Sequence, residues 1–486
     1  MRIDSKINLG LIIATLGFSS LGAVEFKPTG FKATGMGGVG VASSRGSLSG
    51  YYNPALLQLS DFTTEVSINT GVKIRESNLV DNMDKLSDID YETTLDNIEN
   101  NVITGKKSLI INGVVQIDTL GIGTSNKQED RDNLITAIDI LTKKIGSNNA
   151  FEVNLNPSIA TQISNSFALG FYGDLSLGLQ LNIDSKYDKL ITKQNEIGYD
   201  EVYYEYDPDT DYYIGSIGDE AKSNYEATSL EYANNNGINY IQLDAVLLGE
   251  IPLSYARGYD FNSGNWNFGI NAKYMTLATV SHRLDLGESS EEAEDEEYKE
   301  YETTYKPTLG IDLGLAYQPS DIEDFTIGLV TKNINSPKFK VDEVASRNDT
   351  GSKIGDYKID PLIRAGVSKQ YLDKSLEIAL DIDLTKNKTI IDGEESQMLG
   401  AGIEYHPISW FAIRGGAMQD LASKKYDDGI IYTAGLGFGL KWLQVDLSAM
   451  MSSNQGTYDG EDIPRYASVN LSIVSKWGDG YNKKQP

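Results

Sequence analysis

The chain has 486 residues, no cysteine, two histidines and a formal net charge of −28. The lack of cysteine excludes disulfides, thiol chemistry and cysteine-based metal sites, and two histidines exclude a multi-histidine metal centre. The acidic balance argues against binding to nucleic acid and anionic surfaces. Length alone predicts about three ordinary domains, but the pattern along the chain favours one.

The first 23 residues have the features of a secretory signal peptide. Arg2 and Lys6 give a positive start, residues 7–18 form a short apolar run, and small residues follow up to Ala23. The apolar run is too short to span a membrane. We therefore expect cleavage after Gly22 or Ala23 and export of the mature chain.

Residues 33–57, ATGMGGVGVASSRGSLSGYYNPALL, contain the Gly-x-Gly-x-x-Gly spacing of a dinucleotide-binding loop at Gly35, Gly37 and Gly40. Such a loop needs a buried apolar strand before it and a helix after it. The preceding residues, VEFKPTGFKAT, show no apolar strand, and the glycines and the proline that follow would interrupt a helix. We therefore expect no cofactor here.

After residue 62 the chain repeatedly alternates apolar and polar residues, which is typical of β-strands with two different faces. In SLEIALDIDLT, residues 375–385, leucines and isoleucines share one face and acidic residues the other. We identify fourteen such segments, at 63–75, 151–163, 166–183, 238–257, 264–285, 304–318, 325–335, 359–371, 374–385, 396–406, 408–420, 429–441, 443–453 and 463–477.

The connections between these segments alternate strictly between long and short. An even number of antiparallel strands with short periplasmic turns and long external loops is typical of a transmembrane β-barrel. The sequence therefore predicts an all-β fold, a transmembrane antiparallel β-barrel of about 14 strands over residues 63–477, with a tail at 478–486. A large exported β-sandwich is the alternative.

The last strand, YASVNLSIVSKW (466–477), is apolar on one face and ends in Trp477. It resembles the terminal signal read by the outer-membrane assembly machinery. That machinery, outer-membrane lipid and lipopolysaccharide are the expected partners, and the outer membrane of a Gram-negative bacterium is the expected location.

The polar faces of the strands should point into the barrel, because the outer face meets lipid. We expect five charged residues to face the lumen: Lys273, Asp312, Glu377, Asp381 and Asp383.

Residues 76–150 form the longest predicted external loop. Leu134, Ile138, Leu141 and Ile145 have helical spacing, so we predict a helical extracellular insert. The segment SLIINGVVQIDTLGIG within it is ambiguous, but as a barrel strand it would break the alternation of loops. The helical stripe predicts packing within the insert or contact with a protein partner.

Asp207, Asp209 and Asp211 have the spacing of a calcium-binding loop. Tyr212 and Gly218 stand where an EF-hand needs its glycine and its closing acidic residue, so the EF-hand pattern fails. The three aspartates remain a candidate weak divalent-cation site. The acidic run at 287–302 predicts a solvated loop, or one bridged to lipopolysaccharide by divalent cations.

The segment GMGGVGVASSRGSLSGYYNPALL resembles the N-terminal plug of FadL-type outer-membrane transporters of long-chain fatty acids and other hydrophobic compounds. A second stretch, residues 249–275, resembles the barrel-type branch labelled conjugal transfer protein TraF. The resemblance implies a fourteen-stranded barrel with a lumenal plug at residues 24–62. The matching plug residues are Gly35, Gly37, Gly38, Gly40, Asn53, Pro54 and Ala55.

Three functions follow as hypotheses. The first is a plugged barrel that passes small hydrophobic, fatty-acid-like compounds, with a lateral opening at wall glycines such as Gly170, Gly173 and Gly178. The second is a surface scaffold or adhesin linked to conjugation or secretion, acting through its loops. The third, an outer-membrane hydrolase using His282 or His406, has no supporting motif, so we do not expect an enzyme.

Overall fold

The computed structural model describes residues 25–77, 79–87, 107–111, 114–118, 136, 138–145, 149–196, 199–207, 212–286, 302–342, 356–440, 442–458 and 460–478. The predicted signal peptide and most of the predicted tail lie outside these residues. Among the described helices, none combines the length and the apolar character needed to cross a membrane.

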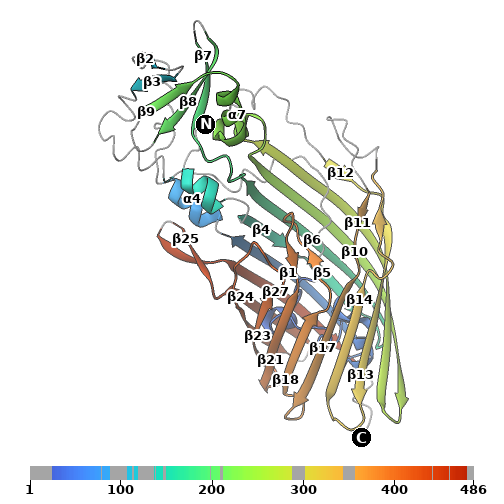
Figure 1. The fold of residues 1–486 in the computed structure, drawn as a ribbon. Helices are drawn as coiled ribbons and strands as arrows, with labels where there is room; N and C mark the ends of the chain where they lie inside the picture. The colour runs from blue at the N-terminus through green and yellow to red at the C-terminus, as the bar shows by residue number, and fades with distance from the viewer. Residues whose placement is uncertain are drawn as a thin grey trace.

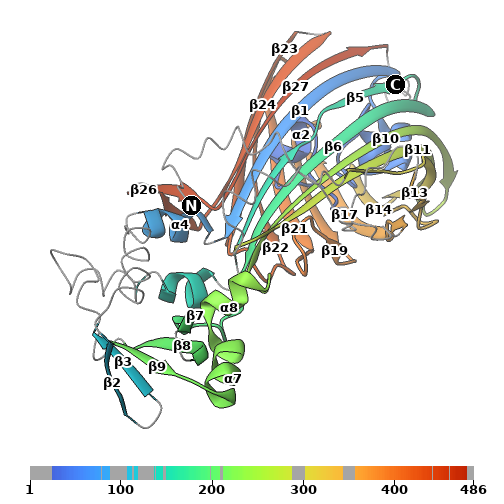
Figure 2. The ribbon, with the colours of Figure 1, turned by 90° about the horizontal axis from the view of Figure 1, so that it is seen from above.

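The chain forms one closed antiparallel β-barrel (Figures 1 and 2). Two of its strands, β4 and β5, are halves of one interrupted strand, so fourteen strands surround the lumen and the predicted fold is confirmed. The strands are β1 (Thr64–Ser77), β4 (Ala150–Leu155), β5 (Ser158–Gln162), β6 (Phe167–Asn182), β10 (Tyr240–Phe261), β11 (Gly264–Asp285), β13 (Thr308–Pro319), β14 (Phe325–Lys332), β17 (Leu362–Tyr371), β18 (Leu376–Asp383), β21 (Met398–Ile408), β22 (Phe411–Asp420), β23 (Ile431–Leu440), β24 (Leu443–Ser452) and β27 (Tyr466–Trp477).

The barrel closes between its first and last strands. β1 pairs with β27 over twelve residues, from Thr64 opposite Trp477 to Arg75 opposite Tyr466. On its other side β1 pairs with β4 and β5. Closure satisfies the backbone N–H and C=O groups that an open edge would leave unbonded in hydrocarbon, at several kcal/mol each.

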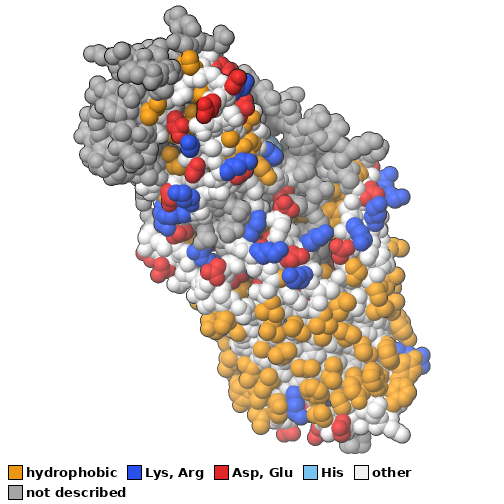
Figure 3. Space-filling model, in the orientation of Figure 1, with side chains coloured by type: hydrophobic (Ala, Val, Ile, Leu, Met, Phe, Trp, Pro, Cys, Tyr) orange, Lys and Arg blue, Asp and Glu red, His pale blue; other side chains and the backbone are white. Residues whose placement is uncertain are grey.

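The two faces of the wall follow the alternation of the sequence. In β1, Ile68 and Val72 are 52% and 44% exposed on the outside, whereas Asn69 and Lys73 are buried inside. The same apolar exterior continues around the barrel and forms a band on the lower half of the face in Figure 3. Such a band is the surface that lipid covers.

Three tryptophans mark the end of the barrel where the turns are short. Trp410 and Trp442 lie in the turns between β21 and β22 and between β23 and β24, and Trp477 ends β27. All three are about half exposed. Indole rings prefer the membrane–water interface, so this end lies at one surface of the bilayer.

The long connections lie together at the opposite end (Figure 1). They carry α4 (Leu79–Ser87), η2 (Ile140–Ile145), α7 (Asp219–Thr228), α8 (Leu230–Asn235), β12 (Glu302–Thr304), β15 (Lys338–Phe339), β16 (Tyr357–Lys358), β19 (Asn387–Lys388), β20 (Glu395–Ser396), β25 (Gln455–Tyr458) and β26 (Glu461–Pro464).

The insert at 76–150 is not purely helical. Besides α4 and η2 it contains the hairpin β2 (Lys107–Ile111) and β3 (Val114–Asp118). β3 pairs with β9 (Tyr212–Ser216), which continues to β8 (Tyr199–Asp207) and β7 (Ile191–Glu196) in a five-stranded sheet. The ambiguous stretch therefore lies outside the barrel as predicted, but in strands. Its alternating residues pair with the next long loop, a long-range partner that local spacing does not reveal.

Residues 25–62, called here the lumenal segment, lie inside the barrel. They form α2 (Phe31–Gly35), α3 (Ser49–Tyr52) and the 3-10 helix η1 (Pro54–Leu59). In Figure 2 α2 appears within the ring of strands. Most of the segment is buried, and η1 packs on β10, β11 and β13.

Glycines on the inner face of the wall admit the backbone of the lumenal segment. A Cβ atom at these positions would collide with segment atoms: Gly269, Gly314, Gly328, Gly400, Gly402 and Gly416. At Gly416 the added Cβ would lie 2.6 Å from the Gly37 nitrogen. The absence of a side chain at these wall glycines therefore leaves room for the backbone of the lumenal segment.

Replacing Gly416 by alanine should loosen the lumenal segment. The added methyl group would overpack against Gly37 and the Ala401 carbonyl, a strain of about 1–3 kcal/mol. We expect a lower thermal unfolding midpoint and faster protease cleavage within residues 25–62. The matched control is Gly415→Ala, whose Cβ would meet only the Thr433 oxygen, at 3.9 Å. Equal behaviour of the two variants would contradict this packing.

Candidate functional site

The glycines of the predicted plug motif lie against the wall between β18 and β23. Gly37 and Gly38 have φ of +67° and +77°, a backbone conformation suited to glycine. The Gly37 N–H donates to Thr433 Oγ1 at 2.8 Å. A Cβ at Gly35 would lie 3.3 Å from the Cα of Gly435. The motif makes a tight turn that fits a wall lined by small residues.

Asn53, Pro54 and Ala55 form the start of η1. Asn53 Nδ2 donates to the carbonyls of Val41 at 3.0 Å and Leu315 at 2.9 Å. Its Oδ1 accepts from the Ala55 N–H at 3.1 Å and so caps the helix. Pro54 occupies the first turn, where no N–H is required. Asn53 thus ties the segment both to itself and to β13.

All five of the charged residues expected to face the lumen are buried inside the barrel, and each joins a network with the lumenal segment or next to it. Asp381 accepts from the N–H groups of Gly40 and Val41 at 2.7 and 2.9 Å. Glu377 accepts from Lys32 Nζ at 2.7 Å. These carboxylates bind the segment directly.

The other three act through neighbours. Asp383 pairs with Arg364, whose Nη2 donates to the carbonyl of Phe26 at 3.2 Å. Lys273 pairs with Asp312 at 2.9 Å. Asp312 also accepts from Asn271, which donates to the carbonyl of Gly50 at 2.8 Å.

The wall is interrupted where the lumenal segment begins. β4 ends at Leu155 and β5 begins at Ser158, so Asn156 and Pro157 lie outside both strands, although Asn156 still donates to Gly71 and Pro157 accepts from Gly173. The facing residues of β6, Gly173 and Asp174, have no partner in β4 or β5. On the other side of β6 the pairing with β10 skips Ile251 and Pro252. Two adjacent seams of the barrel therefore have irregular pairing at about the same level, although the register is the same on either side of each irregularity.

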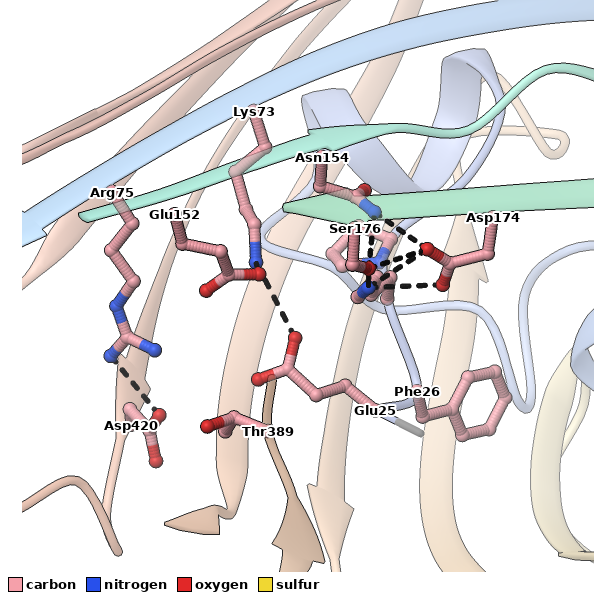
Figure 4. Close-up of polar contacts among 12 residues, drawn as sticks. Glu25, Phe26, Lys73, Arg75, Glu152, Asn154, Asp174, Ser176, Thr389 and Asp420 are labelled. Atoms are coloured by element: carbon pink, nitrogen blue, oxygen red, sulfur yellow. Dashed lines mark hydrogen bonds and ion pairs between the residues drawn. The ribbon is translucent and has the colours of Figure 1, made fainter. Parts of the chain in front are cut away.

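The lumenal segment takes up the polar groups of this interruption (Figure 4). Lys27 Nζ lies 3.0 Å from Asp174, which also accepts from Asn154 at 2.7 Å. Asn156 Nδ2 donates to the carbonyl of Pro28 at 3.1 Å. Gly173 N–H donates to the carbonyl of Pro157 at 2.9 Å. The break in the wall is stabilised from inside.

Glu25 begins the segment beside three cations. Its carboxylate lies 3.4 Å from Lys73 Nζ, which also contacts Glu152 at 2.7 Å. Burial alone would raise the pKa of Glu25, but Lys73, Lys27 and Arg75 outweigh burial and lower it. The group is therefore held as a carboxylate.

A small cavity of about 30 Å³ lies between the segment and the interruption. Its lining includes Tyr51 and Lys27 from the segment, Pro157 and Gly173 from the break, and Leu248 from β10. This volume holds about one water molecule. Tyr51 packs edge-on to Tyr52 at 5.0 Å and contacts Tyr172 at 5.1 Å, so an aromatic cluster closes the cavity on the segment side.

The lumen on the long-loop side of this cavity is filled by an apolar cluster. Its members are Ala150, Val246, Leu248, Met275, Leu277, Tyr305, Phe339, Tyr357, Ile359, Ile390, Ile391 and Tyr426. Seven of them come from the long connections, which fold back into the barrel mouth. Leu248 belongs to this cluster and also lines the cavity. Apolar side chains therefore reach from the long-loop end to the cavity, whose lining also contains the charged residues Asp174, Glu250 and Lys332.

The predicted cation site is not placed. Asp209 and Asp211 lie outside the described residues, and Asp207 ends β8 with its side chain undescribed. In the part of the chain that the structure describes, no group of three or more His, Asp or Glu is arranged to hold a metal ion.

The sequence did not single out the charged residues around the interruption, including Glu25, Lys27, Lys73, Glu152 and Asp174. Asp174 stands in FALGFYGDLSLGLQLNI, where its alternation marks it as inward-facing. Pro157 was the available signal, because proline cannot donate to a sheet ladder.

The Lys27–Asp174 pair should stabilise the segment measurably. Lys27→Met leaves the Asp174 carboxylate part-buried without its cation, so we expect a loss of about 1–3 kcal/mol in unfolding free energy. The double variant Lys27→Met/Asp174→Asn should recover part of this loss. The control pair is Lys222 and Glu226, exposed and 3.9 Å apart, where about 0.5 kcal/mol or less is expected. A double-mutant cycle without coupling at Lys27 would contradict the pairing.

Comparison with known proteins gives a family match over most of the chain. The pattern of the family described as "F plasmid transfer operon, TraF, protein" matches residues 50–383. No curated protein matches the chain.

Among solved structures, the toluene transporter TbuX of Ralstonia pickettii is 13% identical, with coverage of 93% of this chain and 100% of that one and a TM-score of 0.41. The toluene transporter TodX of Pseudomonas putida is 11% identical, with coverage of 95% and 98% and a TM-score of 0.39. A Pseudomonas aeruginosa FadL homologue is 12% identical, with coverage of 94% and 100% and a TM-score of 0.38. Similarity of this degree carries no conclusion about function. The family match spans more than half of the sequence, and the chain belongs to this TraF family.

Proposed function

We propose that this protein passes small hydrophobic compounds across the outer membrane of a Gram-negative bacterium, with the lumenal segment as its gate. The observation that carries the proposal is the position of Leu248, which joins the apolar cluster of the barrel mouth to the cavity at the wall interruption. A hydrophobic compound would enter among the long connections, pass between the packed side chains of this cluster and leave sideways at Gly173.

Lateral exit is favoured over passage along the barrel axis. The short-turn end of the lumen contains η1 and α2, which pack against wall glycines and are held by buried ion pairs. The outer face of the barrel next to the interruption is apolar, and Leu169 and Phe171 are each 46% exposed there.

The state described here is closed. A cavity of about 30 Å³ is smaller than any fatty acid or aromatic hydrocarbon. Passage therefore requires Tyr51 and the start of the segment to move away from the interruption. The part-buried Lys27–Asp174 pair is the contact that has to open.

The substrate class follows from the lining of the route. The cluster offers leucine, isoleucine, methionine and tyrosine side chains from both strands and loops. Such a surface suits compounds with a substantial apolar part, fatty-acid-like molecules included, and does not suit sugars or ions.

Filling the interruption should block uptake. In Gly173→Val the added Cβ would lie 3.2 Å from Pro157 Cγ, and its two methyl groups would press on the Pro157 ring. We expect uptake of radiolabelled oleate and toluene by cells expressing the variant to fall about tenfold, a change of about 1.4 kcal/mol. The control is Gly415→Val in β22, where a Cβ would meet only the Thr433 oxygen, at 3.9 Å. Undiminished uptake by Gly173→Val would contradict lateral exit.

A second candidate is a surface role for the five-stranded sheet built from two long connections. This sheet has its own buried cluster of Ile191, Tyr203 and Tyr225, so it is a folded unit beyond the barrel mouth. A route for small compounds does not need such a unit. The family name refers to a plasmid transfer operon, and a role in cell contact during conjugation is the corresponding proposal.

The two roles can be separated by replacing residues 190–235 with a short glycine–serine linker. This change removes β7, β8, β9, α7 and α8 but leaves the barrel strands intact. If the barrel transports, uptake should persist in the variant. If the sheet acts in conjugation, plasmid transfer frequency should fall while uptake is unchanged. Loss of neither activity would exclude a function for the sheet in these processes.

A further inference from the structure

A small sheet lies where two of the long connections fold back on the barrel mouth. β15 and β16 pair with each other, and Tyr305 adds an edge to them through its antiparallel bridge to Val341. The Lys306 N–H donates to the Lys340 carbonyl at 2.8 Å and continues this edge. We call the set of residues 305–306, 338–341 and 357–358 the mouth sheet.

One face of the mouth sheet is apolar and points into the barrel. Tyr305, Phe339 and Tyr357 belong to the apolar cluster of the lumen, and each is 2% exposed or less. Their rings pack edge-on, with centres 5.9 to 6.5 Å apart. Because side chains alternate across a strand, the residues next to these three point away from the lumen.

That opposite face, called here the lysine face, carries Lys306, Lys338, Lys340 and Lys358. Lys338 lies directly opposite Lys358 in the register, and the bond between Lys306 and Lys340 places these two side by side. All four side chains are exposed. Like charges directly opposite each other in a sheet are unfavourable, so this face favours the binding of an anion.

Two aspartates compensate part of this charge. Asp356 lies 2.9 Å from Lys338, and Asp360 lies 3.1 Å from Lys358. Asp360 is shared with Lys388 of β19, 3.6 Å away, so the next long connection adds a fifth lysine.

The remaining two lysines of the face have less compensation. Among the described residues, no carboxylate oxygen lies within 4.0 Å of the ammonium group of Lys306 or Lys340. Even with Asp342 at the end of the sheet, three aspartates stand against five lysines. The chain as a whole has a net charge of −28, so this face is a local reversal of its charge.

The lysine face borders the apolar exterior of the barrel. Leu309, three residues after Lys306, is 67% exposed, and Ile334, four residues before Lys338, is 45% exposed. Lys and Arg side chains lie directly above the apolar band in Figure 3. Positive charge at this level meets the headgroups of the bilayer.

We propose that the lysine face binds the phosphate groups of lipid A, the membrane anchor of lipopolysaccharide. The long connections of such a barrel lie on the cell-surface side, so the adjoining leaflet is the outer one, whose lipid A carries phosphate beside its acyl chains. Lysine ammonium groups form charge-assisted hydrogen bonds with phosphate oxygens. This inference rests on the proposed location in the outer membrane, but not on transport.

The test uses the full-length barrel purified in detergent, with phosphorylated lipid A as the probe and phosphate-free lipid A as its neutral counterpart. We expect only the phosphorylated lipid to bind in native mass spectrometry. Binding should persist in EDTA, because lysines need no bridging cation.

The double variant Lys306→Gln/Lys340→Gln should weaken binding about tenfold or more, and it leaves no described carboxylate without its cation. Arginine at both positions should retain binding. The matched control is Lys143→Gln/Lys144→Gln, which removes the same charge from exposed positions in another long connection.

The proposal fails if the Lys306/Lys340 glutamine variant binds within about twofold of the wild type, or if the control loses as much affinity. Equal binding of phosphate-free lipid A would assign the contact to acyl chains. Loss of binding in EDTA would assign it to carboxylates bridged by divalent cations, and equal affinity for phosphatidylglycerol would exclude selection of lipid A. Each of these results would overturn the proposal. None of them bears on uptake of hydrophobic compounds, so its failure and that of the transport proposal are distinguishable.

Discussion

A barrel wall in hydrocarbon has no water with which to bond its backbone, and this constraint governs the rest of the molecule. It explains why the first strand must pair with the last, and why β1 and β27 pair over twelve residues. It also makes the interruption at Asn156 and Pro157 informative. A break in the ladder is tolerated only where the backbone groups keep hydrogen-bond partners. Here the Asn156 N–H donates to Gly71 and the Pro157 carbonyl accepts from Gly173 within the wall, and the lumenal segment adds a bond from the Asn156 side chain to the Pro28 carbonyl.

The lumen also contains many buried charged side chains, each of which needs a partner. In the described networks each of these buried cations lies next to a carboxylate. Lys32 and Lys27 of the lumenal segment pair with carboxylates of the wall, and Arg364 pairs with a carboxylate of the neighbouring strand. Buried pairs contribute little net stability compared with apolar packing, but breaking one partner is costly. Such pairs therefore determine the position of the lumenal segment more than they increase the free energy of unfolding of the barrel. A gate needs this property, since its closed position must be defined and yet reversible.

Much of the architecture could be predicted from the sequence because lipid and lumen impose opposite demands on alternate residues. All fourteen segments correspond to barrel strands, and SLEIALDIDLT became β18 with Asp381 and Asp383 inside. The sheet formed by β2, β3, β7, β8 and β9 was not predictable, since its strands pair between two loops more than ninety residues apart. The break between β4 and β5 was missed for a related reason. Pro157 marked it, but its meaning depends on Asn156 contacting a segment far along the chain.

The charged residues of the site illustrate the same limit. Alternation assigns Asp174 to the inner face, but nothing local indicates that Lys27 is its partner across 147 residues. Likewise Gly402 and Gly416 read as ordinary strand glycines until the backbone of Met36 and Gly37 is seen against them. Inward or outward direction is a local property of a strand, whereas contact with the segment depends on the whole fold.

The central claim is that an apolar path leads from the barrel mouth to the wall interruption. The most direct measurement is photo-crosslinking of the intact barrel with a diazirine-bearing fatty acid, followed by mapping of the modified residues by mass spectrometry. The account predicts adducts at Leu248, Tyr51 and Pro157, which line the cavity. Adducts confined to outward-facing residues of the far wall, such as Ile378 and Leu380 of β18, would show that the compound meets the barrel only as lipid does and would contradict it.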